Sequence, residues 1–549
     1  MRSTILRKLS LVFLFSVLSF FAGAALRADE GDPPGRAARL SYTQGNVSLQ
    51  PSGETDWSQA TLNDTLTTGD RLYTDQGARA ELEVGPFAVR LSEATDLTLV
   101  NLDDQTLQLG IGQGSIRVTI YDLPAGNLVE IATPNGALTI TQPGSYRVDT
   151  DPNGTLVSVN QGSLQITGGG ANQTLDSGQA AQLTGTDTVQ VSLVAIPGQD
   201  EFDQWCAGRD GRIESSQSRQ YVDPDTPGYE DLDSNGVWSE VPEYGPVWYP
   251  SGVSVGWVPY RFGHWVWVSP WGWTWVENEP WGFCPFHYGR WALIGTAWGW
   301  VPGPLAVRPV YAPALVAFAG GGGFSIGIGV QAWFPLGPRD PFFPWYHYRP
   351  GYLQAVNASG VRVTNINTII NVRSAAEVRY ANRAVGFTAV SADTFRSGQS
   401  VARGLVRVPA DQMARMGVVP HPDVSPARSA VFGGRGPVAA PVMRTARVTR
   451  PVAPMTPMER RPAPAEGRSV NQPQHFVTRT PPPPREVPFS AKEPALNQHP
   501  GRPLEPQQTQ NLREGKPAGP MRDKEFPPHQ SSREEKPSSH PSSESRPKH

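Results

Sequence analysis

The sequence is short of cysteine and of long apolar runs, and both shortages exclude whole classes of protein. Only Cys206 and Cys284 occur among 549 residues. Neither lies near the N-terminal segment, so a lipid-anchored lipoprotein is excluded. Beyond residue 21, no apolar run free of Gly and Pro approaches the roughly 18 residues that a membrane-spanning helix needs. We therefore predict no stable transmembrane span once the N-terminal segment is removed.

Motifs of the common catalytic sites are also missing. No nucleophile elbow, P-loop or dinucleotide fingerprint occurs, and the glycine run at 320–323 lacks the Lys-Ser/Thr pair of a phosphate-binding loop. Cys284 and His287 form a single C-x-x-H, whereas a zinc site needs three or four protein ligands. The sequence therefore predicts a protein that is not an enzyme, with no cofactor, no metal and no catalytic residue.

The N-terminus has the pattern of a signal peptide, which we place at 1–28. Arg2, Arg7 and Lys8 precede an apolar run over 9–21, and small residues follow it. This pattern predicts export to the periplasm or the extracellular space. Retention of the segment as an anchor is the alternative.

Residues 39–195 are predicted to form a mainly β domain. Short alternating apolar runs recur every 8 to 12 residues or so between Gly, Asn and Asp turns, which is typical of a sandwich, barrel or solenoid. Between two such runs, residues 152–155 read Pro-Asn-Gly-Thr, a hairpin turn in which Asn and Gly tolerate positive φ.

Several motifs of this region resemble the periplasmic FecR-like domain. In order they are Gly45-Asn46-Val47, LTTGDRLYT at 66–74, Gly114-Ser115-Ile116, IATPNGA at 131–137, VNQGSL at 159–164 and Ser177-Gly178-Gln179. The resemblance implies a β fold and, in the best-known members, transmission of an outer-membrane signal to a sigma factor. Those regulators carry a cytoplasmic segment before their membrane helix, whereas only residues 1–8 precede the apolar run here. A FecR-type regulator is therefore an alternative function.

Residues 196–230 are predicted to link two modules. A helix at 201–216 would bury one face and leave two arginines in solvent, the buried face formed by Phe202, Trp205 and Cys206 and the exposed side by Arg209 and Arg212. Residues 231–236 then copy the first half of an EF-hand loop, but Pro242 stands where the bidentate glutamate belongs. A turn is favoured over a calcium site.

Tryptophan is concentrated, since 12 of the 16 tryptophans lie within 238–302. A unit at 256–265 recurs at 282–291, and a third start follows at 299, which predicts small repeated β units. With Phe202, Trp205 and the turn at 231–238, this segment resembles the DUF6600 family, and we place the module at 231–400. The resemblance implies an architecture and no activity.

The aromatic side chains of this module have two interpretations. They fill a core, each burying on the order of 150 to 250 Å², or some form an exposed platform for carbohydrate or another envelope polymer. The candidate ligand-binding residues are Tyr260, Trp265, Trp267, Trp271, Trp273, Trp275, Tyr288 and Trp291. A polysaccharide hydrolase would add Glu277 and Glu279 as its carboxyl pair, but two carboxylates on one strand project in parallel, so a solvated turn is favoured.

The two cysteines also leave alternatives open. In an oxidising compartment Cys206 and Cys284 can form a disulfide. Cys284 occupies the repeat position that Val258 fills in the first unit, which favours a small buried side chain.

Residues 404–549 are predicted to be a disordered tail rich in Pro, Arg and Ser, because this composition buries too little apolar surface to offset backbone entropy. Its basic part at 403–461 has the positive charge that could bind nucleic acid. Export favours a partner in the cell envelope instead, so no nucleic acid is expected. The sequence as a whole predicts an exported, non-enzymatic binding or scaffold protein of the cell envelope, with an envelope protein or polysaccharide as partner.

Overall fold

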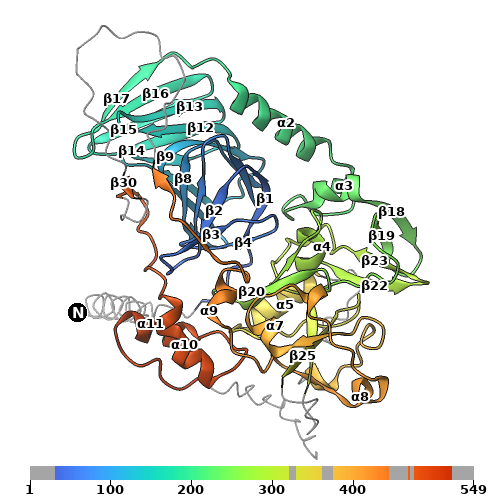
Figure 1. Ribbon diagram of the computed structural model, residues 1–549. Coiled ribbons are helices and arrows are strands. Elements are labelled where there is room, and N and C mark those ends of the chain that lie inside the picture. The colour runs from blue at the N-terminus through green and yellow to red at the C-terminus, as the bar shows by residue number, and fades with distance from the viewer. Residues whose placement is uncertain (1–30, 321–328, 361–374, 444–467, 470–474, 522–549) are drawn as a thin grey trace, which may run out of the picture.

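The computed structural model describes residues 31–320, 329–360, 375–443, 468–469 and 475–521. The signal peptide predicted at 1–28 lies outside these residues. The described residues are mainly β, with 37% strand against 18% helix, as predicted. Figure 1 shows the β domain in blue and teal, the aromatic module in green and yellow beside it, and the C-terminal segments in orange and red along both.

The β domain consists of two sheets that share the long strand β9 (Thr106–Ile120). Sheet A has the order β4 (Thr65–Leu66), β1 (Ala38–Gln44), β6 (Arg79–Val84), β7 (Phe87–Leu91), β9, β12 (Gly144–Asp151), β13 (Gly154–Gln161), β16 (Gln179–Thr184) and β17 (Gln190–Val194). Sheet B has the order β28 (Pro437–Val438), β3 (Trp57–Gln59), β2 (Val47–Gln50), β5 (Arg71–Thr74), β8 (Thr95–Leu102), β9, β10 (Leu128–Ala132), β11 (Ala137–Ile140), β14 (Ser163–Gly168) and β15 (Ala171–Asp176).

Alternation along the strands sorts the side chains of this domain. On β9, Ile116 and Val118 point into the aliphatic core and are fully buried, while Arg117 between them points outward. On β12 the inward residues are Tyr146 and Val148. Because the period of a strand is two, the outer face of sheet A receives the polar residue of each pair. That face carries Glu81, Glu83, Arg90, Arg117, Arg147 and Asp149.

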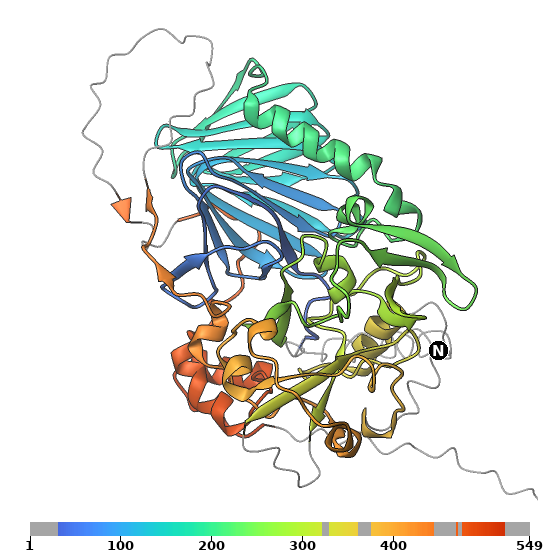
Figure 2. The ribbon, with the colours of Figure 1, turned by 45° about the vertical axis from the view of Figure 1, so that its right-hand side comes forward.

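Helix α2 (Glu201–Ser215) lies on this outer face of sheet A, as Figure 2 shows. Its start is fixed by a capping box, in which Asp200 accepts from the Asp203 amide at 2.9 Å and Asp203 accepts from the Asp200 amide at 3.2 Å. The helix occurs where it is predicted, and Phe202 and Cys206 are buried. The prediction of a solvent-facing Arg209 is wrong, because that side chain is 8% exposed and is paired with Glu81.

The aromatic module contains two four-stranded sheets and a hairpin around one core. The first sheet runs β18 (Gly236–Val241), β19 (Gly245–Pro250), β23 (Ala297–Val301) and β22 (Arg290–Ile294). The hairpin is β20 (Gly263–Val268) with β21 (Gly272–Glu277). The second sheet runs β26 (Thr388–Ser391), β25 (Val330–Pro335), β24 (Val316–Gly320) and β27 (Gly417–Val419). Its helices are α3 (Leu232–Asn235), α4 (Phe283–His287), α5 (Pro350–Ala358), α7 (Ala392–Arg396), α8 (Ala410–Arg415) and α9 (Arg428–Val431), with short 3-10 turns η1 (Gln217–Gln220), η2 (Tyr229–Asp231), η3 (Ala375–Glu377) and η4 (Val401–Arg403).

The predicted disorder of the tail is wrong for 404–443 and 475–521. Strand β27 pairs with β24, β28 extends sheet B, and helices α10 (Phe489–Gln498) and α11 (Pro506–Arg513) follow, while β29 (Val442–Met443) pairs with β30 (Arg468–Ser469). Phe489 and Leu496 are buried. These segments gain their buried surface from the modules on which they lie, so local composition underestimates their order. Residues 444–467, 470–474 and 522–549 lie outside the described part of the chain.

Candidate functional site

The eight aromatic residues predicted as ligand-binding candidates are all buried. The largest exposed fraction is 7%, at Tyr288, and five of the six tryptophans are at 1% or below. A platform for a sugar or polymer needs exposed ring faces, so the platform interpretation is wrong for these rings and the core interpretation holds. The rings concerned are Tyr260, Trp265, Trp267, Trp271, Trp273, Trp275, Tyr288 and Trp291.

Trp265 lies at the centre of this aromatic core. Its ring centroid is 5.5 Å from that of Trp275, 5.4 Å from that of Trp333 and 5.3 Å from that of Phe395. The first two pairs are edge-to-face, the arrangement that the ring quadrupoles favour. Across the hairpin, Trp265 pairs with Trp275 and Trp267 with Trp273, so the four rings share one face. That face is directed into the module and away from solvent.

The carboxyl group of Glu277 is also part of the core. It accepts from the Trp275 indole at 3.1 Å and from the Asn278 amide at 3.2 Å, and its side chain is buried. Burial raises the pKa of Glu277 to about 8. Glu279 lies in the following turn, half-buried, where its carbonyl oxygen accepts from the Asn63 amide group at 2.8 Å. The predicted solvated turn is therefore wrong for Glu277, whose oxygens are held by neighbouring donors.

The cysteines are both free thiols, so the predicted possible disulfide between Cys206 and Cys284 is wrong. Cys206 lies on α2 against sheet A, and burial raises the pKa of its thiol to about 12. Cys284 lies on α4 inside the aromatic core, and burial raises the pKa of its thiol well above the usual range. The two residues sit in separate packing environments, which is why they do not pair.

The acidic turn at 231–236 has its carboxylates directed to different partners. Asp233 accepts from the Gln217 amide at 2.9 Å and from the Ser218 hydroxyl at 2.6 Å. Asp231 instead binds two arginines, at 2.6 Å from Arg39 and 2.9 Å from Arg212. The two carboxylates do not converge on one point, as calcium ligands would.

Arg39 is the centre of the contact between the two modules, which we call the seam. It lies on β1, it is fully buried, and every nitrogen of its guanidinium has a partner. Nε donates to Asn63 Oδ1 at 3.1 Å, Nη1 to Glu83 Oε2 at 3.3 Å, and Nη2 to Asp231 Oδ2 at 2.6 Å and to the Pro280 carbonyl at 2.7 Å. Asn63 and Glu83 belong to the β domain, and Asp231 and Pro280 to the aromatic module.

The carboxyl groups at the seam outnumber the buried cation. Burial opposes ionisation of Arg39, but Asp231 and Glu83 outweigh it and raise the pKa of the guanidinium. Glu230 lies beside Glu83, and its pKa is raised well above the usual range, first by burial and then by the charge of Glu83. Two adjacent buried carboxylates repel each other, so this environment favours the protonated form of Glu230. The charged groups at the seam therefore pair with one another within the chain.

A second buried network fixes α2 to sheet A. Glu81 accepts from Arg90 at 2.5 Å and from Arg209 at 2.5 Å, and despite burial these two cations lower the pKa of Glu81 to about 2. Arg90 also binds Asp210 of α2 at 2.6 Å. In the first turn of the helix, Asp203 binds Arg117 at 3.2 Å and Arg147 at 2.9 Å. Four β strands and the helix are thus joined by ion pairs.

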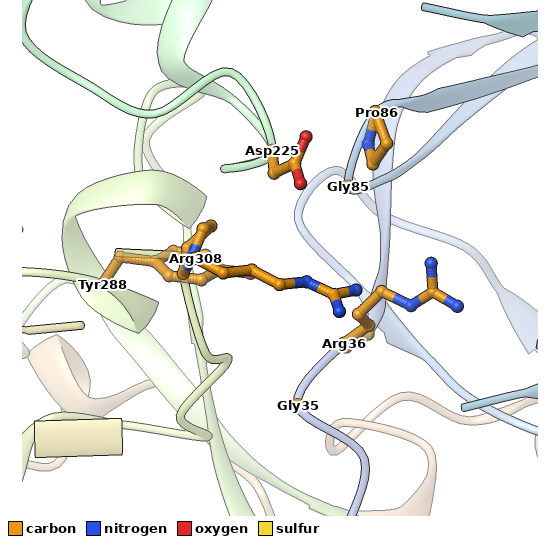
Figure 3. A pocket seen from close by; sticks show the side chains of 9 residues that line it. Gly35, Arg36, Gly85, Pro86, Asp225, Tyr288 and Arg308 are labelled. Carbon is orange, nitrogen blue, oxygen red and sulfur yellow. The ribbon is translucent and has the colours of Figure 1, made fainter. Parts of the chain in front are cut away.

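The seam also contains a small crevice, shown in Figure 3. Arg308 extends from the aromatic module toward Arg36 of the β domain, with Asp225 above the two. Arg36 donates to the Asp103 carbonyl at 2.5 Å, and burial together with Arg308 lowers the pKa of Arg36 to about 10. The space has room for about one water molecule, so it does not suit an organic substrate.

Sequence reasoning missed both networks, although a signal for them exists. Charged residues alternate with apolar residues along the strands of sheet A, namely Glu81, Glu83, Arg90, Arg117 and Arg147. A sheet face with so many charges of both signs is suited to packing against another charged element. The register that aligns these strands depends on the tertiary structure, so the ion-pair partners could not be predicted from the sequence.

Within the described residues, no group of three or more potential metal ligands occurs. No helix of that part of the chain has the length and apolar character needed to cross a bilayer.

One segment of the chain matches a known protein family. Residues 229–340 match DUF6600, a family of unknown function, which confirms the predicted resemblance for that stretch. No curated protein matches the chain. A 1.65 Å crystal structure of a candidate anti-sigma factor from Parabacteroides distasonis ATCC 8503 aligns at 12% sequence identity with a TM-score of 0.21, covering 23% of this chain and 59% of that chain. A second crystal structure of the same description, at 2.50 Å, gives the same values. The alignment spans less than two thirds of that protein, and the FecR-like resemblance stays a prediction.

Proposed function

We propose that this protein is an exported, non-catalytic scaffold of the bacterial cell envelope, in which the β domain and the aromatic module act as one rigid body. The observation that supports this most directly is Arg39, a buried cation whose partners come equally from the two modules. A hinge between independent domains would place solvent at this position, since interfaces between mobile domains are more polar and accessible.

The distribution of aromatic and charged side chains supports the same proposal. Trp265 and its neighbours contribute to a core, and the arginines of sheet A bind α2. Aromatic and charged side chains, which often bind ligands, therefore stabilise the fold here. Binding by such a protein would use its outer surfaces and strand edges, as scaffold proteins do, in preference to an internal cavity.

Export is tested by fractionating cells that produce the full chain with a C-terminal tag and determining the N-terminus of the mature protein. The proposal expects the chain in the periplasm or medium, shortened near residue 28. A cytoplasmic chain with an intact N-terminus would refute export.

Scaffolding is tested by co-sedimentation of the purified mature chain with cell-wall sacculi and with outer-membrane vesicles, followed by an assay for released soluble sugar. The proposal expects sedimentation with one of the two and no released sugar. Sugar release that disappears in Glu277→Gln would instead establish a hydrolase. Failure to sediment with either fraction, combined with altered sigma-factor-dependent transcription after deletion, would favour a FecR-type regulator.

A further inference from the structure

One part of the outer surface of the β domain has aromatic and basic side chains with hydrogen-bond donors that the fold does not use. It lies near the β1 end of sheet A, on the face that α2 covers (Figure 2). Its members are Tyr42 and Gln44 on β1, Arg79 on β6 and Trp205 on α2, and we call them the α2 patch. Gln44 is exposed, and the other three side chains are half-buried.

Trp205 differs from nearly all other tryptophans of the chain in its surroundings. Fourteen of the 16 tryptophans are buried, and only Trp205 and Trp238 are not. The Trp238 indole donates to the Ser218 hydroxyl at 3.0 Å. The Trp205 indole has no acceptor within the described residues, and its nitrogen is not one of the buried donors that lack a partner. The N–H group of Trp205 is therefore open to solvent and free for a ligand.

Arg79 carries a second group of unused donors. The other arginines on the outer face of sheet A each pair with a carboxylate, as Arg90, Arg117 and Arg147 show. Within the described part of the chain, no ion pair or side-chain hydrogen bond involves Arg79. Its guanidinium carbon instead lies 5.6 Å from the centroid of the Trp205 ring. Contact with an aromatic ring holds a guanidinium in place and leaves its N–H groups available.

The strand pairing fixes the remaining members of the patch. Strand β1 has a bulge directly before Tyr42, and such a bulge changes the direction of the side chain that follows it. The Tyr42 ring then lies 5.4 Å from the Trp205 ring. Gln44 is opposite Arg79 in the β1–β6 register, and its Oε1 accepts from the Tyr42 hydroxyl at 3.2 Å. The amide nitrogen of Gln44 is left as a third donor.

The free groups indicate which ligand fits the patch. Phe202 stacks on the Trp205 ring at 5.8 Å, and Arg79 lies over that ring as well. A neutral sugar needs a free aromatic face on which to stack, so this ring does not suit one. The groups left over are all donors, and a positive charge accompanies them. Donors of this kind select a carboxylate, because hydrogen bonds between arginine and a carboxylate are among the strongest in proteins.

We propose that the α2 patch binds an acidic peptide segment of a partner protein. A carboxylate of the segment accepts from Arg79 and from the Trp205 indole, and an apolar neighbour packs on Tyr42. Tryptophan, tyrosine and arginine are the residue types that most often dominate binding energy in protein interfaces. Glu81, which is opposite Tyr42 in register, is already paired with two other arginines, so the charge of Arg79 is left for the partner.

This inference rests on the proposed scaffold function and names the class of its partner. Fluorescence anisotropy with two synthetic peptides tests the required charge. One peptide has Glu-Leu-Glu between Gly-Ser flanks, and the other has Gln at both Glu positions. The purified full chain should bind the Glu peptide saturably and the Gln peptide about tenfold more weakly or less, because the charge-assisted hydrogen bonds are lost. Added salt should weaken binding of the Glu peptide, since it screens exposed charges.

Two substitutions remove the proposed donors and keep most of the local packing. Arg79→Gln removes the cation and should weaken binding of the Glu peptide by about tenfold. Trp205→Phe keeps a ring beside Phe202 but removes the N–H group, and it should weaken binding by about threefold or more. Circular dichroism and thermal unfolding check that each variant is folded.

The matched controls make similar changes outside the patch. Arg219→Gln removes an exposed arginine of η1, and Trp238→Phe alters the other half-buried tryptophan. Glu201→Gln removes an exposed carboxylate one helical turn before Trp205. None of the three should weaken binding of the Glu peptide. Weaker binding in Glu201→Gln would contradict an acidic ligand.

Several results would overturn the proposal. These are no saturable binding of the Glu peptide, equal binding of the Gln peptide, or binding that Arg79→Gln leaves unchanged. A parallel titration uses polygalacturonate, a carboxylated polysaccharide. Binding of this polymer that Arg79→Gln abolishes, without binding of the Glu peptide, would refute a protein partner and assign the patch to a polysaccharide. Export and co-sedimentation are measured separately, so their failure would contradict the proposed function and leave the peptide result unchanged.

Discussion

Replacing Arg39 by methionine is the most direct test of the seam. The substitution keeps much of the side-chain volume but removes the guanidinium that lies 2.6 Å from Asp231 and 3.3 Å from Glu83. Arg39 is fully buried, so water cannot replace the lost donors without opening the contact. Breaking a buried ion pair by removing one partner costs about 3 to 5 kcal/mol. We expect Arg39→Met to lower the free energy of unfolding by this amount.

The assay is urea unfolding followed by two signals. Tryptophan fluorescence reports mainly on the aromatic module, because 12 of the 16 tryptophans lie within 238–302. Far-ultraviolet circular dichroism reports mainly on the strand-rich β domain. In the unaltered chain the two transitions should coincide, since the modules are joined as one body. In Arg39→Met they should separate, because each module then unfolds with less help from the other.

The control is Arg339→Met. Arg339 pairs with Glu243 at 3.2 Å, but both side chains are more than half exposed, so this change should cost less than about 1 kcal/mol. Adding Glu83→Leu to Arg39→Met should recover part of the loss, because it removes one of the carboxylates left without a cation. A cost for Arg39→Met no larger than that of the control, with coincident transitions, would refute the structural role of the seam.

Four further predictions concern the buried groups. Trp265→Ala should lower the free energy of unfolding in urea by about 3 to 5 kcal/mol, and Trp265→Phe should lower it by clearly less. Trp205→Ala, on the half-buried face of α2, is the milder control. Equal effects at both positions would contradict the central place of Trp265 in the core. The folded-state pKa of Glu277 is raised from 4.5 to about 8, so the folded chain holds this proton more tightly and stability should fall as pH rises through that window. Glu277→Gln should reduce this fall in the urea midpoint with pH. An unchanged dependence of the midpoint on pH would contradict the raised pKa of Glu277. The pKa of His287 is lowered from 6.5 to about 3, so the unfolded chain binds the proton more tightly and stability should fall as pH drops below 6.5, a loss that His287→Gln should reduce. Both cysteines should be inert to a thiol reagent in the native protein and titrate as two thiols after unfolding without reductant, whereas fewer than two would indicate a disulfide.

Local patterns were sufficient for many of the elements, but the β unit predicted to recur at 282–291 is wrong at its start, where Phe283–His287 form the helix α4. The two-residue alternation along 116–118 predicts a strand with one buried and one outward face, and β9 has that arrangement. The helix predicted at 201–216 matches α2 to within a residue at its end, because Asp200 and Asp203 supply a capping box in the sequence itself. Such signals lie within a few residues of one another, so no tertiary information is needed to use them.

Partners across long sequence distances were not predictable. Arg209 was expected in solvent, yet it donates to Glu81, which lies 128 residues earlier in the chain. The order of the tail was missed for the same reason. Phe476 and Phe489 lie in a segment of largely polar and Pro-rich composition, and they pack on surfaces that fold from residues hundreds of positions earlier.

The sequence by itself determined that this protein is mainly β and that its tryptophans gather in one module, because strand periodicity and composition are local. Only the tertiary structure decided that those rings fill a core, that Arg39 joins the two modules, and that residues 477–480 lie on sheet B. Burial and ion pairing depend on which distant surfaces meet, and a single sequence read along its length does not contain that register.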